Sequence, residues 1–184
     1  MLFVEDFAAA IEDFSVAIAL NPRDAVAYTL SGDLFEEIGD TSSAVACYMT
    51  AIDLNQADAL SQNKLALLFT TEPNGSLRDG ESAVKLATEA CERTGWTNGD
   101  YLDTLGLAYA ERGDFEAARK CTAEAMALIC DTTMEATFQE HLRSFERGES
   151  VQYKHTKAPF RSHPRPCSLG LLRIPRSPGS SMRP

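Results

Sequence analysis

An all-α fold of stacked helical hairpins is predicted by three features of this 184-residue sequence. A pattern of small and aromatic residues recurs along residues 1–130. Within each copy the apolar residues follow the i, i+3, i+4, i+7 spacing of one helix face. Turn residues separate the copies, and one such hairpin cannot cover its own apolar face. Neighbouring hairpins must therefore stack to form a core.

The recurring element starts with an alanine and places further helix-face residues four and seven positions later. Its copies begin at Ala10, Ala44, Ala83 and Ala118, at offsets of 34, 39 and 35 residues. A second element precedes the last three copies and has a small residue at its centre, which lets adjacent helices approach closely: Gly32, Ala66 or Gly106. The pattern predicts a half repeat at 1–22 and full repeats at about 24–56, 58–95 and 98–130.

The half repeat supplies only the second helix of a hairpin, so Phe3, Phe7 and Ile11 would have an uncovered face. Terminal repeats normally have a polar outer face. We therefore expect the chain to be a fragment or a truncated form of a larger protein. Pairing of this helix with a second copy of the chain is the alternative.

Several departures from the pattern predict looser packing in the middle of the array. Gln62 stands in place of a bulky aromatic residue, and Ala87 and Thr122 replace the aromatic residue of the second helix. The turn at Thr70–Gly80 is five residues longer than its equivalents, with strong turn residues at 72–75. This loop is either a contact site or a variable surface segment.

A capping helix is predicted at 132–148, opened by a capping box at Thr132–Glu135. Its apolar residues form one stripe that suits the end of a stack: Met134, Phe138, Leu142 and Phe145. Residues 151–184 are rich in proline and basic residues, and we expect them to be disordered.

Charge is unevenly distributed. Residues 1–150 hold all 27 acidic and 10 of the 17 basic residues, a formal charge of −17, whereas 151–184 hold seven basic and no acidic residues. An acidic body does not favour nucleic acid or anionic membranes. No apolar run reaches the roughly 18 residues of a membrane span, and no signal peptide is recognisable. A cytoplasmic protein is therefore expected.

Catalytic, cofactor and metal sites are not expected. The sequence contains no nucleotide-binding, zinc-protease or nucleophile-elbow motif. Its five cysteines are odd in number and none are spaced C-x-x-C, which argues against disulfides and zinc. Cys47 and Cys121 occupy equivalent positions and are expected to be small buried side chains. His141, on the capping helix, is expected to be solvated.

The segment Leu105–Tyr109, followed by Gly113-Asp-Phe115 and the alanines from Ala118 to Ala125, resembles a tetratricopeptide repeat, and the resemblance extends over 1–130. It implies a right-handed α-solenoid, of a bacterial type, that serves as a non-catalytic interaction scaffold. In that family the first helix of each hairpin lines a concave groove that holds a peptide or a partner helix. Some members bind chaperone C-termini through basic residues and asparagine, and only Asn63 and Lys64 match that set.

By this resemblance the groove would be lined by Thr29, Asp33, Glu36, Glu37, Asn63, Leu67, Asp100, Asp103, Leu107 and Glu111. These residues are mostly acidic, so we predict a cationic or mixed-apolar partner segment. A second interpretation, in which the acids only solvate the surface, stays open. The alternatives are a nucleic-acid-associated protein that acts through the basic tail and an accessory module of a helical-repeat enzyme.

Overall fold

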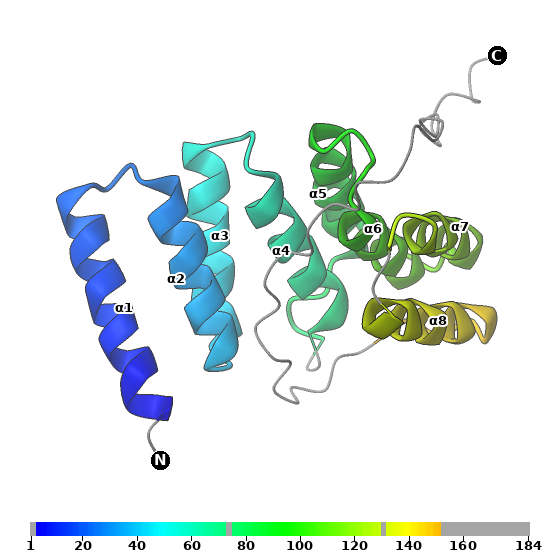
Figure 1. Cartoon of the computed structure of the whole chain (residues 1–184), viewed down its shortest axis with the longest axis horizontal. Coiled ribbons are helices and arrows are strands. Elements are labelled where there is room, and N and C mark those ends of the chain that lie inside the picture. Colours follow the sequence, from blue (N-terminus) through cyan, green and yellow to red (C-terminus); the bar gives the residue numbers. More distant parts are fainter. Residues whose placement is uncertain (1–2, 73–74, 130–131, 152–184) are drawn as a thin grey trace.

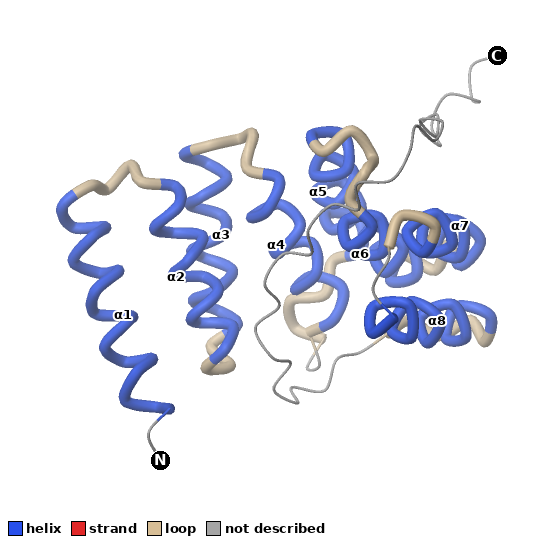
Figure 2. Tube along the Cα trace, viewed as in Figure 1, coloured by secondary structure: helices blue, strands red, loops and turns tan. Residues whose placement is uncertain are grey.

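The computed structural model describes residues 3–72, 75–129 and 132–151, with the backbone alone at 3–6, 8 and 132. These residues form eight α-helices and no strand (Figures 1 and 2). The helices are α1 (Phe3–Leu20), α2 (Ala25–Glu37), α3 (Thr41–Leu54), α4 (Ala59–Thr71), α5 (Gly80–Arg93), α6 (Gly99–Glu111), α7 (Phe115–Met126) and α8 (Thr132–Glu146).

Each helix packs against the next one in the chain, and α4 also packs against α6. The pairs α2–α3, α4–α5 and α6–α7 form antiparallel hairpins, α1 stands at one end and α8 covers the other (Figure 1). The direction of the helix axes changes along the stack: α7 and α8 lie across the direction of α1 to α4 (Figure 1). This sequential packing is that of a helical-repeat solenoid, as the sequence pattern predicts.

Glycine and aspartate set the turns within two hairpins. Gly39 and Gly113 have φ angles of 81° and 83°, a left-handed conformation that ends the preceding helix at little steric cost. The next residue, Asp40 or Asp114, is the N-cap of the following helix and accepts hydrogen bonds from its first turn. The Gly-Asp dipeptide therefore stops one helix and starts the next.

The small residues at the centres of α2 and α6 allow the close approach that the sequence predicts. A Cβ atom on Gly32 would lie 2.5 Å from the ring of Tyr48, which is fully buried in α3. A Cβ atom on Gly106 would lie 2.5 Å from Thr122 Oγ1 in α7. Larger side chains at these two positions would force the hairpins apart.

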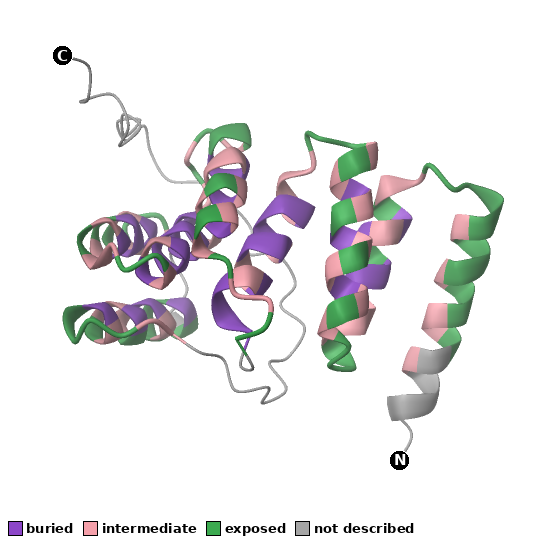
Figure 3. Cartoon of the chain, turned by 180° about the vertical axis from the view of Figure 1, so that it is seen from behind, coloured by how far each residue is buried: buried purple, intermediate pink, exposed green. Residues whose placement is uncertain are grey.

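The core is continuous from α4 to α8 and is buried most fully there, while the described side chains of α1 are exposed or half-buried (Figure 3). Met134, Phe138 and Phe145 of α8 are buried against α6 and α7, and Leu142 is half-buried. The apolar stripe of α8 therefore does cover the end of the stack. The predicted capping box involves the Thr132 side chain, which lies outside the described residues, as does the predicted tail from residue 152.

Two expectations about packing are only partly met. Cys121 is buried as expected, whereas Cys47 is only half-buried. Thr122 does not loosen its surroundings, since it is fully buried and bonds to Asp103. Around Gln62, by contrast, a pocket opens between α3 and α5.

We predict that Cys91 and Cys121 of the native protein resist thiol-modifying reagents. Burial raises the pKa of each thiol to about 12, so almost no reactive thiolate is present near pH 8. Iodoacetamide labelling followed by peptide mass spectrometry should find both residues unmodified until urea is added. Rapid labelling of either residue in the folded chain would contradict the burial described above.

Candidate functional site

The ten residues predicted to line a groove lie on α2, α4 and α6, which we call the first-helix face. They do not share one environment. Some are half-buried or exposed, whereas Thr29, Asn63, Asp103 and Leu107 are buried. Most of the acidic members are engaged in contacts within the chain, and these contacts fall into four groups.

The first group is centred on two carboxylates of α2. The hydroxyl of Tyr48 donates to Asp33 Oδ1 at 2.7 Å and is 2.8 Å from Glu36 Oε2. Lys64 Nζ of α4 lies 2.9 Å from Asp33 Oδ1 and 3.7 Å from Glu36 Oε2. Glu37, next to them, is exposed. We call Asp33, Glu36 and Glu37 the α2 acidic cluster.

The two carboxylates of this group shift the pKa values of the neighbouring tyrosine and lysine. Burial raises the pKa of Tyr48, and the adjacent Glu36 and Asp33 carboxylates raise it further. For Lys64, burial lowers the pKa, but the same two carboxylates outweigh that effect and the net shift is upward. Lys64 therefore stays charged at neutral pH. The α2 acidic cluster holds three negative charges against one positive charge.

The second group links the starts of α2 and α4. Thr29 Oγ1 lies 2.7 Å from Ser61 Oγ and 3.1 Å from Asp58 Oδ2. Asp58 is also the N-cap of α4 and accepts from Ser61 Oγ at 2.8 Å. Thr29 therefore has a structural role in holding adjacent hairpins together.

The third group corrects two expectations. Asp103 is only 4% exposed, because α7 and α8 cover it. Its Oδ1 accepts from Thr122 Oγ1 at 2.9 Å, and its Oδ2 lies 2.7 Å from His141 Nδ1. His141 is 2% exposed and lies between Phe138 and Phe145, so the expectation of a solvated histidine is wrong. Asp103 does not face an open groove.

The fourth group gathers around the lengthened loop. Arg78 of that loop forms an ion pair with Glu111 of α6, and its Nη2 donates to Ser150 Oγ at 2.9 Å. Leu107 is buried under Phe145, and Leu67 and Val151 pack against the same apolar cluster. The loop is therefore a contact site within the chain, where α4, α6 and the segment after α8 meet.

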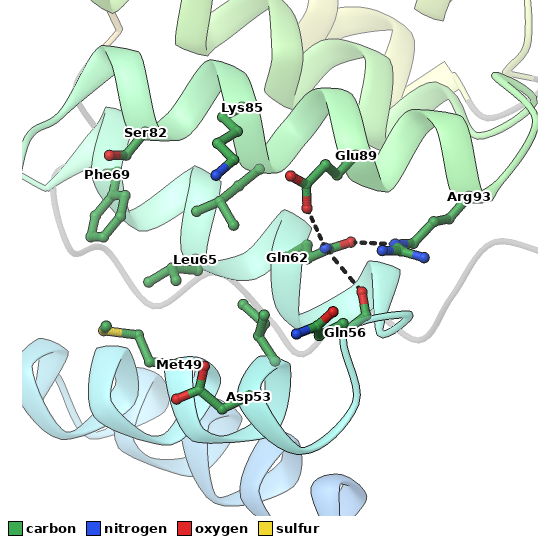
Figure 4. A pocket seen from close by; sticks show the side chains of 12 residues that line it. Met49, Asp53, Gln56, Gln62, Leu65, Phe69, Ser82, Lys85, Glu89 and Arg93 are labelled. Atoms are coloured by element: carbon green, nitrogen blue, oxygen red, sulfur yellow. Dashed lines mark hydrogen bonds between the residues drawn. The ribbon is translucent and has the colours of Figure 1, made fainter.

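A pocket of about 560 Å³ lies on another face, between α3 and α5 (Figure 4). Gln62 forms part of its wall, where it donates to Glu89 Oε2 at 2.8 Å and accepts from Arg93 Nε at 3.1 Å. The apolar part of the wall comes from Met49, Ile52, Leu65, Phe69 and Leu86. One feature of the sequence indicated loose packing at this place, namely the glutamine at position 62 where an aromatic residue is usual.

Within residues 3–72, 75–129 and 132–151, no three His, Cys, Asp or Glu side chains are grouped so that they could hold a metal ion. None of the described helices has the length and apolar character to cross a membrane. On α1, Phe7 and Ile11 are half-buried and Leu20 is 82% exposed.

Comparison with known families supports the resemblance on which the groove was predicted. Residues 25–58, which contain the hairpin α2–α3, match the family model of the tetratricopeptide repeat. Compared with curated proteins, the chain shows no match. Tetratricopeptide repeats generally mediate protein–protein interaction and are generally non-catalytic. Residues 25–58 are therefore similar to a tetratricopeptide repeat, and the hairpins α4–α5 and α6–α7 follow them in the same helical-repeat stack.

Proposed function

We propose that the chain is a non-catalytic scaffold that binds a cationic segment of a partner protein on its first-helix face. The observation that carries this proposal is the geometry of the α2 acidic cluster. Tyr48 holds the Asp33 and Glu36 carboxylates on one side of α2, and both remain partly exposed. Lys64 offsets only one of the three negative charges of the α2 acidic cluster, so a lysine or arginine of a partner would meet an excess of negative charge that is already held in place, which reduces the entropy lost on binding.

The binding region is smaller than the sequence predicts. Asp103 and Leu107 are buried and Glu111 is paired with Arg78, so none of the three is available to a partner without rearrangement. The α2 acidic cluster remains, together with the half-buried Leu67 on the neighbouring α4, whereas Asn63 is buried. We therefore expect complementary charge near α2 and apolar or backbone contacts near α4.

Replacing Glu37 by lysine should weaken the binding of a cationic peptide by about five- to tenfold, because an exposed attraction becomes a repulsion. The probe is a short fluorescein-labelled peptide of alternating lysine and leucine, measured by fluorescence anisotropy. A glutamate–leucine peptide of the same length should not bind. Glu37 is exposed, so the change should leave the fold intact.

Glu92→Lys provides a matched control, because Glu92 is also exposed but lies on α5. It changes the net charge of the protein by the same amount as Glu37→Lys. Equal weakening by both variants would show a general effect of net charge, and the proposed site would be rejected. Loss of binding only in Glu37→Lys supports a site at the α2 acidic cluster.

A further inference from the structure

The pocket between α3 and α5 is an elongated groove. These are the second helices of two neighbouring hairpins, and α4 packs against both and forms the floor between them. The lining positions run from Ser82 to Arg93 on α5, and in the same direction from Met49 to Gln56 on α3 (Figure 4). The eleven positions from Ser82 to Arg93, at about 1.5 Å each, make it roughly 16 Å long. We call it the α3–α5 groove.

The floor of the α3–α5 groove is apolar and continues into the core. Leu65 of α4 is 3% exposed and belongs to a buried cluster shared by α3 and α4. Ile52, Phe69 and Leu86 pack against that cluster but are only half-buried. Met49, at the α3 rim, is 51% exposed. Methionine and phenylalanine are enriched in protein interfaces, and covering their open sides would be favourable.

Gln62 closes one end of the groove with a fixed polar wall. Its Nε2 donates to Glu89 Oε2 at 2.8 Å and to the Gln56 carbonyl at 3.3 Å. Its Oε1 accepts from Arg93 Nε at 3.1 Å. Because Gln62 is itself buried, it holds the Glu89 and Arg93 side chains in place. The groove therefore has its shape before a ligand arrives, which reduces the entropy lost on binding.

The two rims of the groove carry opposite charges. Lys85 and Arg93, on α5, are exposed, and neither forms an ion pair with a described residue. Asp53, on α3, is exposed as well. Together with Glu89, the lining holds two positive and two negative charges, whereas residues 1–150 as a whole carry −17. A ligand with acidic and basic residues on opposite sides therefore suits this groove better than a strongly cationic one.

The walls of the groove suit a helix. Side chains three and four positions apart form ridges along a helix, and these ridges fit between those of neighbouring helices. Three turns of helix are about 16 Å long, which matches the length of the groove. Binding of an amphipathic helix in an apolar groove is a common mode of peptide recognition.

We propose that the α3–α5 groove binds an amphipathic helix of a partner protein. The apolar stripe of that helix lies on the floor between Ile52 and Leu86. Its acidic residues face Lys85 and Arg93, and its basic residues face Asp53. The charges orient the helix, while the apolar contacts provide most of the affinity. This surface is separate from the α2 acidic cluster, so it goes beyond the function proposed above.

The test measures binding of a designed helical peptide to variants of the full chain by fluorescence anisotropy. The probe is a fluorescein-labelled peptide of about four helical turns. It has leucine at every third or fourth position, glutamate along one side of this stripe and lysine along the other. Lys85→Glu should weaken its binding about five- to tenfold, because an exposed attraction becomes a repulsion. Lys120→Glu is the matched control, since Lys120 is also exposed but lies on α7, and it should bind like the unmodified chain.

The apolar contact is tested without a change of charge. Met49→Ala should weaken binding of the probe about fivefold, because less apolar surface is covered. Val16→Ala is its control, since Val16 is 54% exposed and lies on α1, and binding should not change. A probe with proline at its centre cannot continue the helix and should not bind. The alternating glutamate–leucine peptide spreads leucine over all sides of a helix and should not bind here either.

Each other outcome overturns the proposal in a distinct way. Equal weakening by Lys85→Glu and Lys120→Glu would show an effect of net charge alone. Loss in only one of Lys85→Glu and Met49→Ala would show that the groove is not read as a whole. Binding of the proline-containing probe would assign an extended peptide to the site. Loss in Glu37→Lys instead would place the probe on the first-helix face. Absence of binding by every variant would reject the groove, and the lysine–leucine peptide would still test the proposed function independently.

Discussion

Phe145→Ala is expected to destabilise the protein by about 3–5 kcal/mol, the usual cost of removing a buried phenylalanine. The side chain is 1% exposed and packs against Leu107, Ala110 and Ala118. It therefore connects α8 to both helices of the last hairpin. Because a repeat array is stabilised mainly by contacts between neighbours, the loss should appear first at α8 and then spread inward.

Urea unfolding measures the total loss, and amide exchange locates it. In the variant, exchange should increase most in α8 and at the start of α7, and least in α2 and α3. Leu142→Ala on the same helix is the matched control and should cost clearly less, because Leu142 is only half-buried. Equal costs for the two changes would show that α8 is held by something other than its apolar stripe.

The helices could be predicted from sequence because local signals coincide with the repeat. The Gly-Asp pairs at Gly39 and Gly113 end one helix and cap the next, and both turns have the expected conformation. Gly32 indicated a close approach between helices, and the Tyr48 ring occupies that space. These features depend on residues near one another in the sequence or one period apart, so a single sequence contains them.

The candidate site was harder to predict because it depends on which helices cover one another. The repeat pattern places Asp103 on the same face as Asp33, yet α8 packs over α6 and encloses Asp103. The periodicity of the sequence shows which residues share one face of a helix, but it does not show which other helix packs over that face. The ion pair between Arg78 and Glu111 could not be predicted from the repeat pattern either, because the lengthened loop has no counterpart in the other repeats.

Asp103→Ala should cost about 3 kcal/mol, because it removes a buried acceptor from Thr122 and His141 at the same time. An ionised carboxylate only accepts hydrogen bonds, so His141 Nδ1 donates to it in that state. The three residues come from α6, α7 and α8, which makes Asp103 the polar link among the last three helices. Thermal unfolding monitored by circular dichroism measures the loss.

Two further variants separate this link from simple loss of volume. Asp103→Asn has almost the same shape and keeps one acceptor oxygen, so it should recover part of the stability. Asp53→Ala removes an exposed carboxylate of α3 and should change stability by no more than about 0.5 kcal/mol. If Asp103→Ala is as mild as Asp53→Ala, the carboxylate is not needed to hold α8.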